Sequence, residues 1–210
     1  MAQHRFKLVL LGDSAVGKSC LATRFVSNDY HEFQEPTIGA SFLTKKILVN
    51  DKKITFEIWD TAGQERYKSL APMYYRGASA ALIVFDITCR DSYNGAKLWI
   101  NEIYQKTQNC LIMFVANKSD LINEYKEKDD EYYVKPEEIE EYAEKEEINY
   151  IFTSAKTGNN IEKTFQIIGK YLLENNDNNT NNTNTNNTNT NNTNVNLTEN
   201  TLISEKRRCC

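Results

Sequence analysis

The stretch Gly12-Asp13-Ser14-Ala15-Val16-Gly17-Lys18-Ser19 decides the fold, because it fits the pattern G-x-x-x-x-G-K-[ST]. The apolar run Phe6–Leu11 before it predicts a buried strand, and Lys18–Val26 predicts a helix. Glycines at these positions let the backbone wrap around phosphate oxygens, while successive N–H groups and the helix N-terminus attract negative charge. A chance glycine-containing turn is the alternative, but the strand–loop–helix context favours a nucleoside triphosphate site, with the base left open.

Two side chains of this loop have predicted chemical roles. We expect Lys18 to reach the β- and γ-phosphates and the Ser19 hydroxyl to bind Mg²⁺. The predicted nucleotide-binding residues of the loop are Ser14, Ala15, Val16, Gly17, Lys18, Ser19 and Cys20.

Residues 1–174 continue as alternating predicted strands and helices around this loop. The further strands are Phe42–Val49, Ile54–Trp59, Ala80–Asp86, Leu111–Asn117 and Tyr150–Thr153, and the further helices are Asp91–Thr107, Pro136–Glu147 and Ile161–Leu173. Asn50-Asp51 reads as a hairpin turn between the first two of these strands. The pattern predicts an α/β fold with a mostly parallel six-stranded sheet, one antiparallel edge strand and helices on both faces. Ligands of such sheets lie beyond the carboxyl ends of the strands.

Two segments at predicted strand ends favour guanine as the base. Asn117-Lys118-Ser119-Asp120 follows a buried strand, where the Asp120 carboxylate can accept hydrogen bonds from guanine N1–H and N2–H₂. Adenine lacks that edge, so ATP would leave the carboxylate unpaired at a cost. Ser154-Ala155-Lys156 follows the last strand, where a loop can close over the base. The predicted base-side residues are Asn117, Lys118, Asp120, Ser154, Ala155 and Lys156.

Two further segments carry candidates for metal binding and catalysis. Asp60, in Asp60-Thr61-Ala62-Gly63-Gln64, can hold Mg²⁺ through water, and Thr37 can add a second hydroxyl to the metal. Gly63 has no Cβ and can therefore approach the γ-phosphate closely. Gln64 is the predicted catalytic residue, because its amide can orient an attacking water.

Taken together, these motifs resemble a known family. GDSAVGKS, PTIG, WDTAGQE, NKSD and SAK resemble the Ras superfamily of small GTPases, over about residues 5–174. Within it, IGASF, WDTAGQERYKSLAPMYYRGA and a terminal Cys-Cys resemble Rab proteins. The stretches HEFQEPTIGASFLTKK and YKSLAPMYYRGASAALIVFDIT are most similar to the early-endosomal Rab subgroup. The resemblance implies a GTP/GDP switch that hydrolyses GTP slowly, is stimulated by an activating protein, and recruits effectors in vesicular trafficking.

The resemblance also implies roles for individual residues. Tyr30 would lie against the guanine, and Thr37 and Gly63 would contact the γ-phosphate only in the GTP state. The family's effector-binding aromatic triad corresponds to Phe42, Trp59 and Tyr74.

A local argument supports an exposed position for Trp59. Residues 54, 56 and 58 are apolar and alternate onto one face of their strand, which leaves Trp59 on the other face. We therefore expect Trp59 to be partly exposed, unless a neighbouring segment covers it.

Composition changes sharply after Glu174, and residues 175–196 are almost wholly Asn and Thr. Such a segment buries too little apolar surface to order itself, so we expect a GTPase domain at residues 1–174 and a disordered tail at 175–210. The sequence finishes with Lys206-Arg207-Arg208-Cys209-Cys210. By resemblance, Cys209 and Cys210 carry geranylgeranyl groups, and the basic triplet adds attraction to anionic lipid.

The expected location follows from this ending and from the N-terminus. No apolar run is long enough to span a bilayer, and MAQHRF has neither a signal-peptide layout nor a glycine at position 2. We expect the cytoplasmic face of intracellular membranes, with the early endosome as the site, and a carrier-bound pool in the cytosol. The implied partners are a guanine-nucleotide exchange factor, a GTPase-activating protein, prenyl-binding carriers and effectors.

Charge excludes one class of partner and marks one departure from the family. The net charge is −4 and no basic patch suggests nucleic acid. Residues 122–147 contain twelve acidic and four basic residues, including an acidic insertion within Asn123–Val134. A solvated helix preceded by an acidic loop is one interpretation, and a docking surface for a basic partner is the other. The five cysteines match neither a disulfide framework nor a zinc site.

Four alternative functions can be weighed against these residues. A hydrolysing switch needs Gln64, whereas a module that only holds nucleotide often lacks it. An ATP-using P-loop enzyme is disfavoured by Asp120, and a soluble nuclear-transport GTPase by the Cys-Cys ending. The sequence favours the switch.

Overall fold

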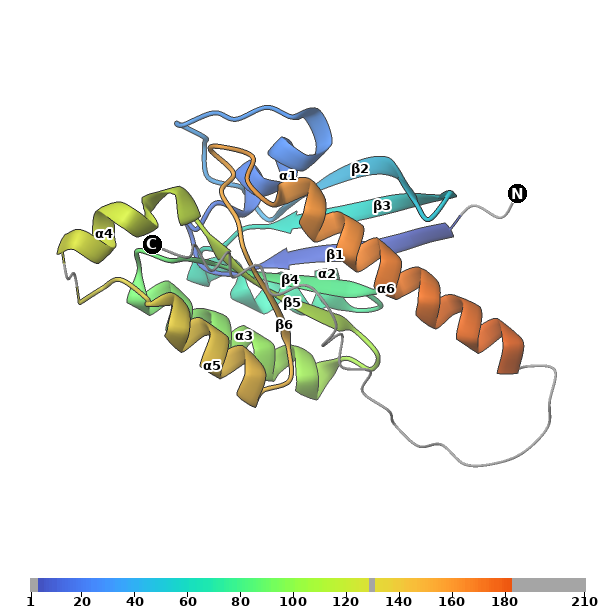
Figure 1. The fold of residues 1–210 in the computed structure, drawn as a ribbon. Helices are drawn as coiled ribbons and strands as arrows, with labels where there is room; N and C mark the ends of the chain where they lie inside the picture. The colour runs from blue at the N-terminus through green and yellow to red at the C-terminus, as the bar shows by residue number, and fades with distance from the viewer. Residues whose placement is uncertain (1–3, 129–130, 183–210) are drawn as a thin grey trace, which may run out of the picture.

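The computed structural model describes residues 4–128 and 131–182, and these form an α/β fold around a six-stranded sheet (Figure 1). The strand order is β2-β3-β1-β4-β5-β6. Only β2 and β3 pair antiparallel among these neighbours, so the predicted mostly parallel sheet with one antiparallel edge strand is confirmed. The strands are β1 His4–Leu11, β2 Ala40–Val49, β3 Lys52–Thr61, β4 Ala80–Asp86, β5 Leu111–Asn117 and β6 Asn149–Phe152.

The hairpin between β2 and β3 has the predicted turn. Val49 pairs with Lys52, which leaves Asn50 and Asp51 as a two-residue loop. Both have positive φ, 48° and 59°, which is the requirement of a type I′ turn and suits Asn and Asp. The turn fixes the register that later brings Phe42 opposite Trp59.

Helices cover both faces of the sheet (Figure 1). On one face α1 and α6 pack together, and the rings of Phe25 and Phe165 stack with centroids 3.5 Å apart. On the other face α2, α3 and α5 cover β4 and β5, whose residues are buried throughout. The helices are α1 Lys18–Ser27, α2 Ala71–Tyr75, α3 Arg90–Lys106, α4 Ile122–Lys128, α5 Pro136–Lys145 and α6 Ile161–Asn182, with short 3₁₀ helices at η1 Glu65–Leu70 and η2 Ser119–Leu121.

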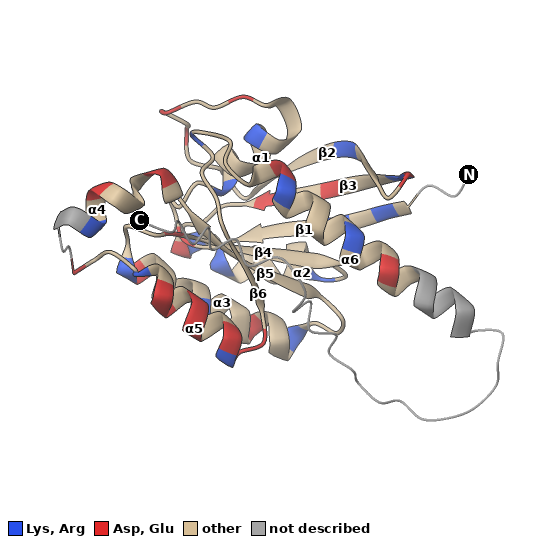
Figure 2. Cartoon of the chain, in the orientation of Figure 1, with Lys and Arg blue, Asp and Glu red and all other residues tan. Residues whose placement is uncertain are grey.

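The acidic insertion differs from the predicted loop, because its first part forms α4, on which Figure 2 shows acidic residues. After residues 129–130 the chain returns to the core, where Tyr133 and Val134 are buried. The Val134 N–H donates to the Ile87 carbonyl at 2.9 Å, and Arg90 donates to the Tyr133 carbonyl at 2.8 Å. Two apolar side chains and two hydrogen bonds thus anchor the end of this segment.

The helix α6 runs past its predicted end. It continues from Leu173 to Asn182, so the structure describes residues 175–182 as helix, where the composition predicted disorder. Extending an existing helix adds one hydrogen bond for each residue fixed and avoids the free-energy cost of nucleating a new helix. A prediction from composition alone does not take this difference into account. Residues 183–210, including Cys209 and Cys210, lie outside the described residues. Within the part that the structure describes, no helix combines the length and apolar character that a membrane crossing requires.

Candidate functional site

The loop between β1 and α1 has the backbone of a phosphate cradle. Gly12 and Gly17 have φ of 140° and 94°, a region that side chains disfavour. A Cβ on Gly12 would lie 2.1 Å from the Val84 carbonyl oxygen, and one on Gly17 would lie 2.4 Å from the Asn117 Nδ2. Both glycines are therefore required by close packing as well as by backbone conformation.

Lys18 is buried at the start of α1 and points back over the loop. Its Nζ donates to the carbonyls of Gly12 at 2.9 Å and Asp13 at 2.7 Å. Burial lowers the pKa of Lys18 to about 8, while the nearby carboxylates of Asp60 and Asp13 oppose that shift. A phosphate at this ammonium would add negative charge and favour the protonated form.

Three predicted metal ligands meet although they come from distant parts of the chain. The Ser19 hydroxyl donates to Asp60 Oδ2 at 2.6 Å and lies 2.9 Å from the Thr37 hydroxyl. Thr37 in turn lies 3.4 Å from the same carboxylate oxygen. Ser41, which the sequence did not single out, donates to it as well, at 3.3 Å.

The Asp60 carboxylate is suited to bind a cation. Its Oδ1 is buried and has no hydrogen-bond partner among the described residues. Burial raises the pKa of Asp60, whereas the hydrogen bond from Ser19 opposes that rise. A carboxylate with two hydroxyls is a hard oxygen set, and Mg²⁺ commonly binds one or two protein ligands and completes its shell with phosphate and water. Ser19, Thr37 and Asp60 are thus the residues that would hold Mg²⁺.

Gly63 and Gln64 lie beside the phosphate loop. A Cβ on Gly63 would be 2.3 Å from the Asp13 carbonyl oxygen and 2.5 Å from Lys18 Nζ, so its backbone lies directly against the loop. Gln64 lines a cavity of about 230 Å³ together with Lys18, Thr37 and Gly63. The predicted catalytic amide therefore shares one cavity with the phosphate-binding and metal-binding residues.

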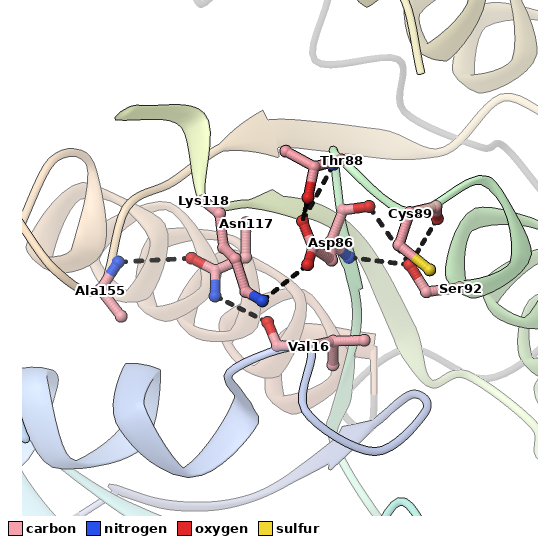
Figure 3. A network of polar contacts seen from close by, with 8 residues as sticks. All are labelled: Val16, Asp86, Thr88, Cys89, Ser92, Asn117, Lys118 and Ala155. Atoms are coloured by element: carbon pink, nitrogen blue, oxygen red, sulfur yellow. Dashed lines mark hydrogen bonds and ion pairs between the residues drawn. The ribbon is translucent and has the colours of Figure 1, made fainter. Parts of the chain in front are cut away.

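The base-side motifs are joined through Asn117, which Figure 3 shows between two loops. Its Nδ2 donates to the Val16 carbonyl at 2.8 Å, and its Oδ1 accepts from the Ala155 N–H at 3.3 Å. Ser154 donates to Asp120 Oδ1 at 2.5 Å. The structure thus brings the phosphate loop, Asn117–Asp120 and Ser154–Lys156 together, and their contacts with a nucleotide stay a prediction.

Lys118 has a partner that sequence reasoning missed. Its Nζ lies 2.6 Å from Asp86 Oδ2, and Asp86 Oδ1 accepts from the Thr88 hydroxyl at 2.7 Å (Figure 3). Asp86 ends β4 beside Asn117 at the end of β5. Its signal in the sequence is a carboxylate at the carboxyl end of an otherwise apolar strand, which is where ligands of parallel sheets lie.

The three predicted effector-binding aromatics form one cluster. The Trp59 ring centroid lies 5.1 Å from that of Phe42 and 5.7 Å from that of Tyr74. Phe42 is 52% exposed. Trp59 is partly exposed, as expected, although the rings of Phe42 and Tyr74 pack beside it. The cluster joins β2, β3 and α2.

This geometry defines a P-loop nucleotide-binding protein, with a phosphate cradle at α1 and a carboxylate-bearing base site at the ends of β5 and β6. A model of the Ras family matches residues 7–174, and the chain therefore belongs to the Ras family. Proteins of this family are small GTPases, which bind GTP and GDP with Mg²⁺, hydrolyse GTP and act as switches.

Proposed function

We propose that this chain is a Rab-type small GTPase that cycles between GDP and GTP, hydrolyses GTP slowly by itself and recruits effectors to membranes of the endocytic pathway. The observation that carries the proposal is the Phe42–Trp59–Tyr74 cluster and its connections. Phe42 follows Thr37 along one segment, and Gly63 and Gln64 lie between Trp59 and Tyr74 along the other. An exposed aromatic surface of this kind is typical of a protein-binding site.

The nucleotide-sensing groups connect this surface to the phosphate site. In the proposed GTP form, Thr37 and Gly63 contact the γ-phosphate, and both segments relax when it leaves. Gln64 orients the attacking water, and Lys18 balances charge on the β- and γ-phosphates. Bound Mg²⁺ supplies further positive charge at the phosphate oxygens. Each nucleotide state would therefore hold the aromatic cluster in a different arrangement.

Membrane attachment is proposed through Cys209 and Cys210. Each buried CH₂ of a lipid contributes about 0.8 kcal/mol and stable anchoring takes two signals, which two geranylgeranyl chains provide. Lys206-Arg207-Arg208 adds attraction to anionic headgroups. Exposed lipids would make a cytosolic pool insoluble, so prenyl-binding carriers join the exchange factor, activating protein and effectors as proposed partners.

Imaging the full-length tagged chain tests the assignment. We expect it to coincide with a probe for early-endosomal phosphatidylinositol 3-phosphate, and we expect the double change Cys209→Ser and Cys210→Ser to release it into the cytosol. Cys89→Ser is the matched cysteine control, and a Gly/Ser replacement of residues 183–196 tests whether that stretch acts only as a spacer. Both should leave the location unchanged.

The outcomes separate the parts of the proposal. A full-length chain spread through cytosol and nucleus would contradict the Rab assignment. A chain on another organelle that still needs both cysteines would contradict the endocytic role alone.

A further inference from the structure

Arg24, in the last turn of α1, ties three backbone carbonyls together. Its Nε donates to the Ala155 carbonyl at 2.9 Å and its Nη2 to the Lys156 carbonyl at 2.8 Å. Its Nη1 donates to the Asn28 carbonyl at 3.0 Å, just past the end of α1. One side chain therefore joins the end of the phosphate-binding helix to the loop that follows β6.

The same guanidinium also lies against Tyr30. Its Cζ is 5.8 Å from the centroid of the Tyr30 ring, within the range of a cation–π contact. Tyr30 begins the segment that leads to Thr37. Arg24 thus contacts both the loop and the aromatic side chain that are expected to border the base.

The hydrogen bonds fix Ala155 from both sides. Its carbonyl accepts from Arg24, and its N–H donates to Asn117 Oδ1 at 3.3 Å. Ala155 is buried, so loss of the arginine would leave a carbonyl poorly satisfied. Next to it, Ser154 holds the Asp120 carboxylate. Any displacement of this loop would therefore pass to the group that is predicted to read guanine.

Only arginine has the donors for this arrangement. Its planar guanidinium offers N–H groups in a rigid fork that can serve several carbonyls at once. Lysine offers a single point charge, which could keep one carbonyl and the contact with the Tyr30 face but not the fork.

We propose that Arg24 is a positioning residue for the base site. It holds residues 154–156 and Tyr30 where they receive guanine, and thereby sets the lifetime of the bound nucleotide. This inference rests on the proposed binding of guanine nucleotides.

Nucleotide release from the full-length protein tests the inference. Each protein is loaded with fluorescent GDP in Mg²⁺ and chased with unlabelled GDP. We expect Arg24→Gln to release GDP about tenfold faster, which corresponds to the loss of one or two hydrogen bonds. Arg24→Lys should release it about threefold faster, since it keeps the charge and one contact. Arg5→Gln, which removes an exposed ion pair with Glu57, is the matched control and should release GDP as the wild type does.

Two further readouts separate positioning from general destabilisation. Inosine diphosphate lacks the N2 amine, so the preference for GDP over it should narrow in Arg24→Gln, whereas a general weakening would lower both affinities equally. Chelation of Mg²⁺ should speed release by the same factor in variant and wild type, because Ser19, Thr37 and Asp60 are untouched.

The possible results are distinct. Wild-type release rates and an unchanged GDP preference in Arg24→Gln would overturn the inference. If that variant does not fold, Arg24→Lys carries the same test with a smaller expected effect. Failure of the wild type to retain GDP would instead overturn the proposed function, and the inference with it.

Discussion

The base side and the phosphate side of the site are built differently. On the base side, Asn117 is 1% exposed, and hydrogen bonds within the chain join it to the phosphate loop and to Ala155. On the phosphate side, the segment before β2 is open to solvent, with Phe33 94% exposed. Its Thr37 is joined to the core through the Ser19 hydroxyl and the Asp60 carboxylate. One oxygen of that carboxylate is buried and has no hydrogen-bond partner within residues 4–128 and 131–182.

This difference in contacts and exposure indicates that the two sides of the site have different roles. On the base side, hydrogen bonds within the protein hold Asn117, Asp120 and Ala155, so these residues are organised before the nucleotide arrives. On the phosphate side, the Asp60 carboxylate would bind a cation, and side chains of the segment before β2 such as Phe33 and Ile38 are largely exposed. We infer that the base side supplies constant affinity, whereas the phosphate side responds to which nucleotide is bound.

The largest effect is expected on the base side, from Asp120→Asn. This change removes the carboxylate that we expect to accept two hydrogen bonds from guanine, so GDP affinity should fall roughly 10²- to 10⁴-fold. Xanthosine diphosphate should bind better than GDP, because an amide can donate to its extra carbonyl. Competition binding measures both affinities, and Asp51→Asn in the hairpin turn is the matched control. An unchanged preference for GDP would show that the base lies elsewhere.

The next effect is expected on the phosphate side, from Ser19→Asn. The variant loses the hydroxyl that donates to Asp60 at 2.6 Å and that would bind Mg²⁺. Affinity for GTP should fall about a hundredfold and that for GDP by less, since Ser19 would hold a metal ion whose positive charge offsets more negative charge in GTP than in GDP. Titration of both nucleotides at fixed Mg²⁺ gives the ratio. Equal losses for GDP and GTP would contradict a role for Ser19 in sensing the γ-phosphate.

Gln64→Leu should affect the chemical step alone. Leucine cannot orient water, so the intrinsic rate of hydrolysis should fall about tenfold while nucleotide affinity is unchanged. Phosphate release in a single turnover measures the rate without an activating protein, which could supply a glutamine of its own. Gln105→Leu, at an exposed position of α3, is the matched control. A wild-type rate in Gln64→Leu would refute the catalytic assignment.

Ser41→Ala should have the smallest effect of the series. Its hydrogen bond to Asp60 is long, at 3.3 Å, and Ser19 and Thr37 remain to serve the same oxygen. The apparent Mg²⁺ affinity of the nucleotide complex should weaken about threefold, which corresponds to the free energy of one weak hydrogen bond. Mg²⁺ titration of GDP release measures it. A loss as large as that of Ser19→Asn would mean that Ser41 belongs among the metal ligands.

Sequence predicted most of this site because its motifs fall at the ends of strands. Residues 12–19, 60–64, 117–120 and 154–156 lie at or just beyond the carboxyl ends of β1, β3, β5 and β6, and parallel pairing brings those ends together. The residues of the aromatic cluster were predicted from the family resemblance alone. The pairing that places Phe42 opposite Trp59 depends on the two-residue turn between β2 and β3.

The missed residues act through tertiary contacts that no local pattern records. Arg24 lies on a helix where a basic residue is ordinarily solvated, and two of its three carbonyl partners are more than a hundred residues away. In the sequence, Asp86 is only the last residue of an apolar strand. Its role becomes visible in the structure, which places Lys118 beside it. The short α2 and the helical start of the acidic insertion lack the long periodic pattern from which helices are predicted.

The difference between the base side and the phosphate side can be tested by hydrogen exchange of backbone amides. The exchange is compared between the GDP complex and a non-hydrolysable GTP complex, both with Mg²⁺. We expect protection to rise in the GTP-like state at residues 29–39 and 62–75, on the phosphate side. We also expect no change at residues 117–120 and 153–158, on the base side. Equal changes on both sides, or changes confined to the base side, would contradict the division of tasks inferred from the structure.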